Sequence, residues 1–410
     1  MKRLLIAAVL VCAAVGCQRH IANPPDGNPD IGTSGTIERT LAEANNRFAF
    51  SLLSALESGA DGSIMISPTS VAIALTMTYN GARRNTQAQM ADVLAVRGIS
   101  LDDLNAMHAS LQRFLEDPSS DIMLAVANSL WGRIGTPFDP DFLARNREFY
   151  GAQVRELDFS DPTSVDTINN WADEQTRGKI PTILDDVDPE AVLYLINAIY
   201  FKGIWTYTFD DQLTSNEAFY HPSGMAQHPM MQQQTDFEYL ERAGFQAVRL
   251  PYGESGRFGM YIFLPRPGLP LREFALGLTT DSWEGYLADF STRPGLLKLP
   301  RFTLRCEKTL NETLQALGMT DAFDAFSSDL TGMFDQSGWN GYISEVRHKT
   351  FMEVSEEGTE AVAVTSIEIA PINEGPHWDF VMIVNRPFLC AIVDRESGLI
   401  LFIGTVREFD

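Results

Sequence analysis

Covalent catalysis needs a nucleophile with a base beside it, and the chain offers few candidates. Neither the G-x-S-x-G pattern of a serine nucleophile elbow nor an S-x-x-K pattern occurs in the sequence. Cys390 lies in an apolar run, residues 388–393, where a buried structural thiol is expected rather than a reactive thiolate. His348 has no H-E-x-x-H motif around it and no second histidine at ligand spacing. These patterns predict no catalytic residues, no metal site and no cofactor.

The charge balance restricts the class of partner. The 410 residues include 31 Lys and Arg against 54 Asp and Glu, a formal net charge of -23. Nucleic-acid binding draws much of its affinity from basic side chains on phosphates, and no basic stripe is present. We therefore expect no nucleic-acid partner. An acidic surface is also poorly suited to binding anionic lipids or polysaccharides by charge.

The first residues have the composition of a targeting segment. Two basic residues precede an apolar stretch, residues 4–15, that is shorter than the ~20 residues needed to cross a bilayer. Residues 14–17, Ala-Val-Gly-Cys, resemble the cleavage box of bacterial lipoproteins, although Ala14 stands where Leu is usual. The resemblance implies a lipoprotein signal peptide over residues 1–17, with a lipidated Cys17 as the mature N-terminus.

An ordinary signal peptide with an incidental cysteine is the alternative. Gln18 is not Asp, so by the same resemblance nothing retains the product in the inner membrane. We expect a protein of the bacterial cell envelope that is held by its lipid at the outer membrane. Whether it faces the periplasm or the cell exterior stays open.

One folded domain is expected after this leader. Residues 18–36 are rich in Pro, Gly, Asn and Asp and predict a flexible tether. No second linker or repeat follows, so residues 37–410 are taken as one domain. Residues 40–56 carry apolar side chains at helical spacing, and Ser67 followed by Pro68 starts another helix with a capping residue and a first-turn proline.

The later part of the chain is rich in strands. The β-rich segments are residues 193–200, 259–264, 383–393 and 399–406. They are apolar almost throughout, so both faces of each strand should be covered. The fold class is α+β, with helices early and strands late.

Several short segments, in order along the domain, resemble the serpin family. The most specific is residues 197–205, Asn-Ala-Ile-Tyr-Phe-Lys-Gly-Ile-Trp. The other segments are residues 64–71, 74–77, 81–82, 127–131, 168–171, 176–180, 299–302, 317–319, 348–350 and 385–388. Any one of them is a weak signal, but their number and order leave little room for chance.

The resemblance implies a serpin fold of three β-sheets and eight or nine helices, with an exposed reactive-centre loop. A protease cleaves this loop, which then inserts into the central sheet. The residues that match the family's shutter, beneath the centre of that sheet, are Ser67, Ser70, Asn197 and His348, and Trp205 matches the breach at its top. A buried network of hydroxyl, amide and imidazole groups is also reasonable physically, because each group needs a partner once it is desolvated.

Function depends on whether the loop can insert. The hinge is Gly358, Thr359, Glu360, Ala361, Val362, Ala363 and Val364. In a strand, successive side chains point to opposite faces, and the face that begins with Thr359 carries only small or apolar residues. No proline, which would break a central strand, occurs from Gly358 to Ala370, and the first one after the hinge is Pro371. Val362 and Val364 depart from the family's alanine-rich hinge, so we expect slowed but not abolished insertion.

The same resemblance predicts an ion pair at the base of the loop and the position of the cleaved bond. Glu356 and Arg301 match two adjacent positions of opposite charge, which predicts an ion pair at the loop base. The usual spacing from the hinge glycine gives Ile372-Asn373 as the bond that is cut. The apolar residues before this bond favour cleavage by an elastase-like protease. Subtilisin-like and papain-like enzymes are further alternatives.

The function expected is irreversible suicide inhibition of serine endopeptidases, with cysteine endopeptidases as a second class. A non-inhibitory serpin that acts as a binding or adhesion module is the alternative. The region where heparin-regulated relatives carry a basic helix, residues 101–116, has Arg113 as its only Lys or Arg. We therefore expect no heparin activation, and we expect a monomer.

Overall fold

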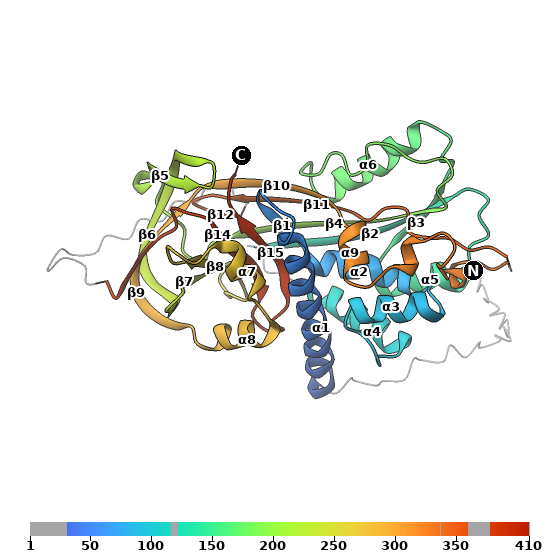
Figure 1. Cartoon of the computed structure of the whole chain (residues 1–410), viewed down its shortest axis with the longest axis horizontal. Coiled ribbons are helices and arrows are strands. Elements are labelled where there is room, and N and C mark those ends of the chain that lie inside the picture. Colours follow the sequence, from blue (N-terminus) through green and yellow to red (C-terminus); the bar gives the residue numbers. More distant parts are fainter. Residues whose placement is uncertain (1–30, 116–121, 337, 360–377, 410) are drawn as a thin grey trace, which may run out of the picture.

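A computed structural model describes residues 31–115, 122–336, 338–359 and 378–409. Most of the described α-helices come before residue 176 of the chain, and Figure 1 shows several of them below the long strands. Within the described residues the α-helices are α1 (Ile31–Glu57), α2 (Pro68–Tyr79), α3 (Arg84–Val93), α4 (Leu101–Leu115), α5 (Pro140–Tyr150), α6 (Thr163–Gln175), α7 (Leu271–Leu276), α8 (Thr280–Ala288) and α9 (Asn311–Ala316).

The strands fall mainly in the middle and last parts of the chain. In order they are β1 (Ile64–Ile66), β2 (Ile122–Arg133), β3 (Gln153–Leu157), β4 (Leu193–Ile204), β5 (Ser215–His221), β6 (Gly224–Arg242), β7 (Phe245–Pro251), β8 (Phe258–Pro265), β9 (Ser291–Pro300), β10 (Phe302–Thr309), β11 (Arg347–Val354), β12 (Gly358–Thr359), β13 (Phe380–Ile383), β14 (Phe388–Asp394) and β15 (Ile400–Val406).

Helix α2 begins where the sequence predicts. The Ser67 hydroxyl accepts a hydrogen bond from the Ser70 backbone N–H at 3.3 Å, and Pro68 occupies the first turn, where its missing N–H is harmless. Almost every residue of α2 is buried, as expected for a helix enclosed within the core. The cap therefore sets where α2 begins. The helix packs against both β4 and β15.

The six-stranded sheet runs in the order β10-β11-β12-β4-β2-β3. Its long β2 and β4 are antiparallel, and their register sets Asn128 opposite Asn197. The two-residue β12 separates β11 from β4 at one end of the sheet. This sheet lies along the upper side of the molecule in Figure 1, with α2 beneath it.

The other strands form a nine-stranded sheet in the order β1-β15-β14-β8-β7-β6-β9-β13, with β5 beside β6. The long β6 belongs to two parts of it. Residues 224–230 of β6 pair with β5, residues 230–239 pair with β9, and residues 238–242 pair with β7. The three predicted sheets are therefore present. One is the six-stranded sheet, and the other two are joined into the nine-stranded sheet by β6, which takes part in both.

Two predicted boundaries are wrong. Residues 31–36, assigned to the tether by composition, are instead the first residues of α1, which begins at Ile31. Once the buried face of a helix is anchored, each further residue adds a hydrogen bond without a new nucleation cost. The segment 383–393, predicted as one strand, is divided between β13 and β14. β13 pairs with β9 and β14 with β8 and β15, and Pro387 lies in the break.

The remaining predicted strands are confirmed. β14 and β15 are buried along their whole length, and so is β8, as their continuous apolar runs require. Among the helices of the described residues, none is both long and apolar enough to span a bilayer.

Candidate functional site

Four side chains predicted to lie together beneath the central sheet do so. The backbone N–H of Ser67 donates to Nε2 of His348 at 3.0 Å, and the Ser70 hydroxyl donates to the Asn197 side-chain oxygen. Ser67, Ser70 and His348 are 5% exposed or less. The α2 cap and the β4 and β11 strands therefore meet in one hydrogen-bonded cluster, which we call the shutter cluster.

Asn128 is a further member that motif reasoning missed. Its side-chain oxygen accepts from the Asn197 amide at 2.6 Å, and its own amide donates to the Tyr150 carbonyl at 2.8 Å. It thereby links the shutter cluster to the end of α5. The signal was available, because Asn128 lies in a resembling segment as a polar residue within an otherwise largely apolar strand.

The shutter histidine is held neutral. Burial lowers the pKa of His348 to about 4, because the charged imidazolium would lose its hydration. The hydrogen bond from Ser67 uses Nε2 as an acceptor, so the neutral ring carries its proton on Nδ1. Burial also raises the pKa of Cys390 in β14 to about 12, so this thiol stays protonated at neutral pH.

Trp205 lies where the predicted breach is, at the end of β4. Its indole N–H donates to the Ser355 carbonyl at 2.9 Å, and its backbone N–H donates to the Glu357 carbonyl at 2.8 Å. The Tyr252 ring stacks on the indole with centroids 4.4 Å apart. Trp205 therefore fixes both ends of the turn that follows β11.

The predicted pair at the loop base is formed. Nε of Arg301 lies 3.0 Å from Oε2 of Glu356, and Thr214 donates to the same carboxylate at 2.8 Å. Burial alone would raise the pKa of Glu356, but the hydrogen bonds from Arg301 and Thr214 outweigh it and leave this pKa lowered. Arg301 is about half exposed, so the pair contributes only about 1 kcal/mol to ordinary stability.

The start of the hinge already lies in the central sheet. As β12, Gly358 and Thr359 pair antiparallel with β4, and Thr359 also pairs with Val354 of β11. Thr359 is 2% exposed, and its hydroxyl is 2.6 Å from the Tyr252 hydroxyl. The predicted inward orientation of Thr359 is thus seen without any cleavage of the loop.

Two glycines permit this close approach. Gly358 has a φ of +155°, and a Cβ there would lie 2.1 Å from the carbonyl oxygen of Gly203. A Cβ on Gly203 would in turn lie 2.7 Å from the Tyr252 ring. No other residue type fits either position without displacing β12 or the ring.

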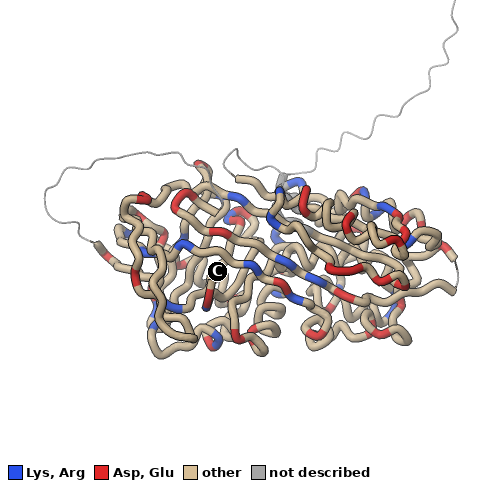
Figure 2. Tube along the Cα trace, turned by 90° about the horizontal axis from the view of Figure 1, so that it is seen from above, with Lys and Arg blue, Asp and Glu red and all other residues tan. Residues whose placement is uncertain are grey.

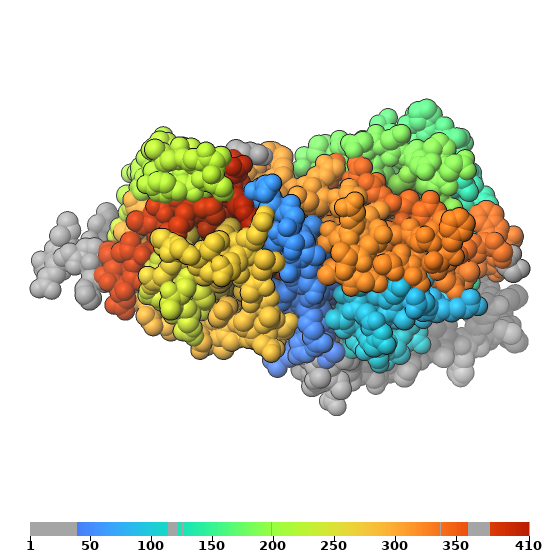
Figure 3. Space-filling model, viewed as in Figure 1, coloured from blue at the N-terminus to red at the C-terminus, as the bar shows by residue number. Residues whose placement is uncertain are grey.

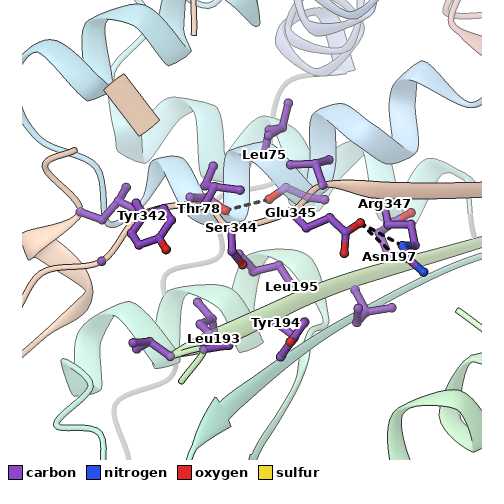
Figure 4. Close-up of a pocket in the computed structure, with 18 of the residues that line it drawn as sticks. Leu75, Thr78, Leu193, Tyr194, Leu195, Asn197, Tyr342, Ser344, Glu345 and Arg347 are labelled. Carbon is purple, nitrogen blue, oxygen red and sulfur yellow. Dashed lines mark hydrogen bonds and ion pairs between the residues drawn. The ribbon is translucent and has the colours of Figure 1, made fainter. Parts of the chain in front are cut away.

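Beyond β12, the facing edges of β4 and β11 have no described strand between them. At the end of β4 far from β12 a cavity of about 230 Å³ opens between these strands. Figure 4 shows Leu193, Tyr194 and Leu195 of β4 on one side and Leu75 and Thr78 of α2 on the other, with Glu345 and Arg347 nearby.

The outer surface of the central sheet mixes both signs of charge (Figure 2). Lys349 pairs with Glu307 at 3.0 Å, and Lys179 with Glu353 at 3.7 Å. In α4, Arg113, the only Lys or Arg, bonds within its own helix. This geometry offers no cluster of cations at α4 for a polyanion.

Several predicted residues lie outside the described part of the chain. They are the lipidation site Cys17, the hinge residues Glu360, Ala361, Val362, Ala363 and Val364, and the reactive bond Ile372-Asn373.

Comparison with known proteins shows which proteins this chain resembles. A family model described as Serpin (serine protease inhibitor) matches residues 43–409. An uncharacterized serpin-like protein of Thermococcus kodakarensis is 32% identical over 99% of this chain and 99% of its own length. Leukocyte elastase inhibitor of Sus scrofa is 36% identical over 90% of this chain and 99% of its own length.

Solved structures agree with the sequence matches. The thermophilic serpin tengpin in its native state superposes with a TM-score of 0.83 at 32% identity, over 90% of this chain and 94% of that one. Its latent state gives a TM-score of 0.78 at 30% identity, over 91% and 98%. The predicted fold class is confirmed.

Acid should destabilise the native state through His348. Its pKa of about 4 lies below the ordinary value of about 6.5, so the unfolded chain binds the proton first as pH falls. The free energy of unfolding should decrease from about pH 6.5 to about pH 4 and level off below, by at most about 3 kcal/mol for this residue. His348→Gln, which can accept the Ser67 hydrogen bond without titrating, should flatten the slope in denaturant unfolding.

His108→Gln is the matched control. Burial also lowers the pKa of His108 to about 4, but this ring packs on the Tyr150 side chain and reaches the shutter cluster only through the Tyr150 carbonyl that Asn128 binds. Each variant should therefore remove its own share of the slope, and the double variant should remove both. An unchanged slope in His348→Gln would contradict the assignment.

Proposed function

Because the chain belongs to the serpin family, we propose that it is an irreversible suicide inhibitor of serine endopeptidases. The protease cleaves the reactive-centre loop, forms an acyl-enzyme, and is carried and distorted as the loop enters the central sheet. Elastase-like serine proteases are the preferred targets, and papain-like cysteine proteases are a second class. In this proposal the protease supplies the catalytic groups.

The observation that carries this proposal is the position of β12. The chain turns back after β11, and Ser355 N–H donates to the Gly358 carbonyl at 2.9 Å across the turn. Thr359 then occupies the first position between β11 and β4. The loop therefore starts from a register in which continued pairing adds residues alternately to the buried and outer faces. That register supports insertion as the driving step.

The energetic scale is sufficient. A strand of about a dozen residues gains ladder bonds worth ~1 kcal/mol net each, roughly 10 kcal/mol before side-chain burial. This is comparable with the whole stability of an ordinary domain, about 5–15 kcal/mol. Leukocyte elastase inhibitor, a relative at 36% identity, adds support for an elastase-like target.

Incubation with an elastase-like serine protease should give a complex that survives denaturing electrophoresis. Thr359→Arg should be cleaved without forming that complex, because the inserted strand would bury an unpaired charge at a cost of several kcal/mol. In the native state the same change would displace β12 from the Tyr252 hydroxyl. The complex yield at fixed protease ratio measures both effects.

Thr309→Arg, at an exposed position of β10 in the same sheet, is the matched control and should keep the wild-type yield. Cleavage of the wild type with no stable complex would favour the non-inhibitory alternative. Complex formation by Thr359→Arg at the wild-type yield would instead disprove insertion through this hinge.

The bond that is cut should be Ile372-Asn373. Residues 357–384 contain no Lys or Arg, so a trypsin-like pocket built around an acid has nothing to pair with. Mass spectrometry of the peptide released on complex formation should find Asn373 at its N-terminus. A peptide that begins elsewhere would shift the register, and efficient inhibition of trypsin would refute the specificity.

The mature protein is further proposed to be a lipoprotein of the bacterial outer membrane, anchored through Cys17. The support is the residues 14–17 box and Gln18 after it. Cells that express the full chain and are fed an alkyne fatty acid should label the wild type, and Cys17→Ser should stay unlabelled. Cys12→Ser, a second leader cysteine, is the control and should label normally. Labelling of Cys17→Ser would exclude this anchor.

A further inference from the structure

Two histidines that the shutter and hinge do not use face each other beside the C-terminal segment. Nε2 of His221, at the end of β5, lies 2.7 Å from Nε2 of His228 in β6. The ring of Phe409 packs against both imidazoles, with centroid distances of 5.3 and 4.6 Å. Figure 3 shows the yellow-green β5–β6 hairpin at the surface, next to the red C-terminal segment. Both histidines are partly exposed.

The second nitrogen of His221 is already committed. Nδ1 lies 2.9 Å from the Arg407 carbonyl oxygen, which can only accept, so Nδ1 carries the proton. The neutral His221 ring therefore presents an unprotonated Nε2 to His228. A backbone carbonyl on the far nitrogen is also what orients metal-ligating histidines in proteins.

The charged side chains near the two histidines have other partners, so none of them occupies the space between the two Nε2 atoms. The Arg407 guanidinium turns away to the buried Glu57 carboxylate at 2.5 Å, so only its carbonyl faces the pair. Glu217 stands opposite His228 in the β5–β6 register and is paired with Lys298. Within the described residues no third His, Cys, Asp or Glu joins the two rings closely enough to complete a metal cluster. Other ligands would then be water.

We propose that His221 and His228 form a two-histidine site for a borderline divalent transition ion such as Zn²⁺, in which the His228 proton moves from Nε2 to Nδ1 and the metal takes the place of the Nε2–H···Nε2 hydrogen bond. Imidazole nitrogen is a preferred ligand of Zn²⁺, Cu²⁺ and Ni²⁺. A tetrahedral Zn²⁺ bound at about 2.0–2.1 Å separates two ligand nitrogens by about 3.3 Å. The observed 2.7 Å needs to widen by only about 0.6 Å, next to an exposed turn at residues 222–224.

The protonation of His228 agrees with this site. Burial, and then the neighbouring His221, lowers the pKa of His228, so the ring is neutral and able to ligate at neutral pH. Binding would tie the hairpin turn to the C-terminal segment, because the His221 ring holds the Arg407 carbonyl on its other side.

The test is a Zn²⁺ titration of the untagged full-length chain at neutral pH in competition with a chromophoric chelator. One equivalent should bind, and His221→Gln and His228→Gln should each abolish it. His377→Gln and His20→Gln, the same change at histidines outside the described residues, should keep it. Zn²⁺ should raise the unfolding midpoint of the wild type by a few degrees and leave the two site variants unshifted.

X-ray absorption of the wild-type zinc complex makes the outcome independent of how the variants fold. Two imidazole ligands with the remainder oxygen would support the site. Absence of one-equivalent saturable binding would overturn the proposal. Retention of that equivalent in either site variant, or its loss in His377→Gln or His20→Gln, would also overturn it. None of these readouts depends on inhibition of a protease.

Discussion

An unfilled position in the central sheet is the constraint on which the rest of this molecule depends. The facing edges of β4 and β11 are joined by no described strand other than the two-residue β12. Backbone N–H and C=O groups need partners, and an open strand edge is a template for pairing with another segment. A fold that keeps such an edge open stores free energy, and the proposed function requires its other contacts to control when that energy is released.

The control is applied at two levels along the opening. At the top, Trp205 holds the carbonyl oxygens of Ser355 and Glu357, and Glu356 is held by Arg301. At the centre, the shutter cluster links α2, β4 and β11 through small, directional hydrogen bonds. These contacts are individually weak beside the roughly 10 kcal/mol available from a full strand. Contacts of this strength are compatible with the larger rearrangement that the proposed function requires.

Much of this was predictable from local sequence, where chemistry and spacing coincide. The Ser67-Pro68 start of α2 follows from capping alone, and the Glu356–Arg301 pair follows from matched motifs. Tyr252 was not predictable, because its role depends on β8 and β7 bringing the residues after Pro251 beside Trp205 and Thr359. The division of 383–393 into β13 and β14 was missed for the same reason, since strand partners far apart in sequence decide where a β-rich run ends.

The two-residue length of β12 has its own physical consequence. A strand that enters a sheet from a free loop must first form a turn and then its first pair, and the turn entails most of the entropy loss. Here the turn after β11 is closed, and the first pairs to β4 and β11 exist. Gly358 and Gly203 make this possible, because side chains at either position would hold the backbones apart. In the proposed inhibitory function, further entry is therefore elongation rather than nucleation, and each added pair is favourable once cleavage has freed the other end of the loop.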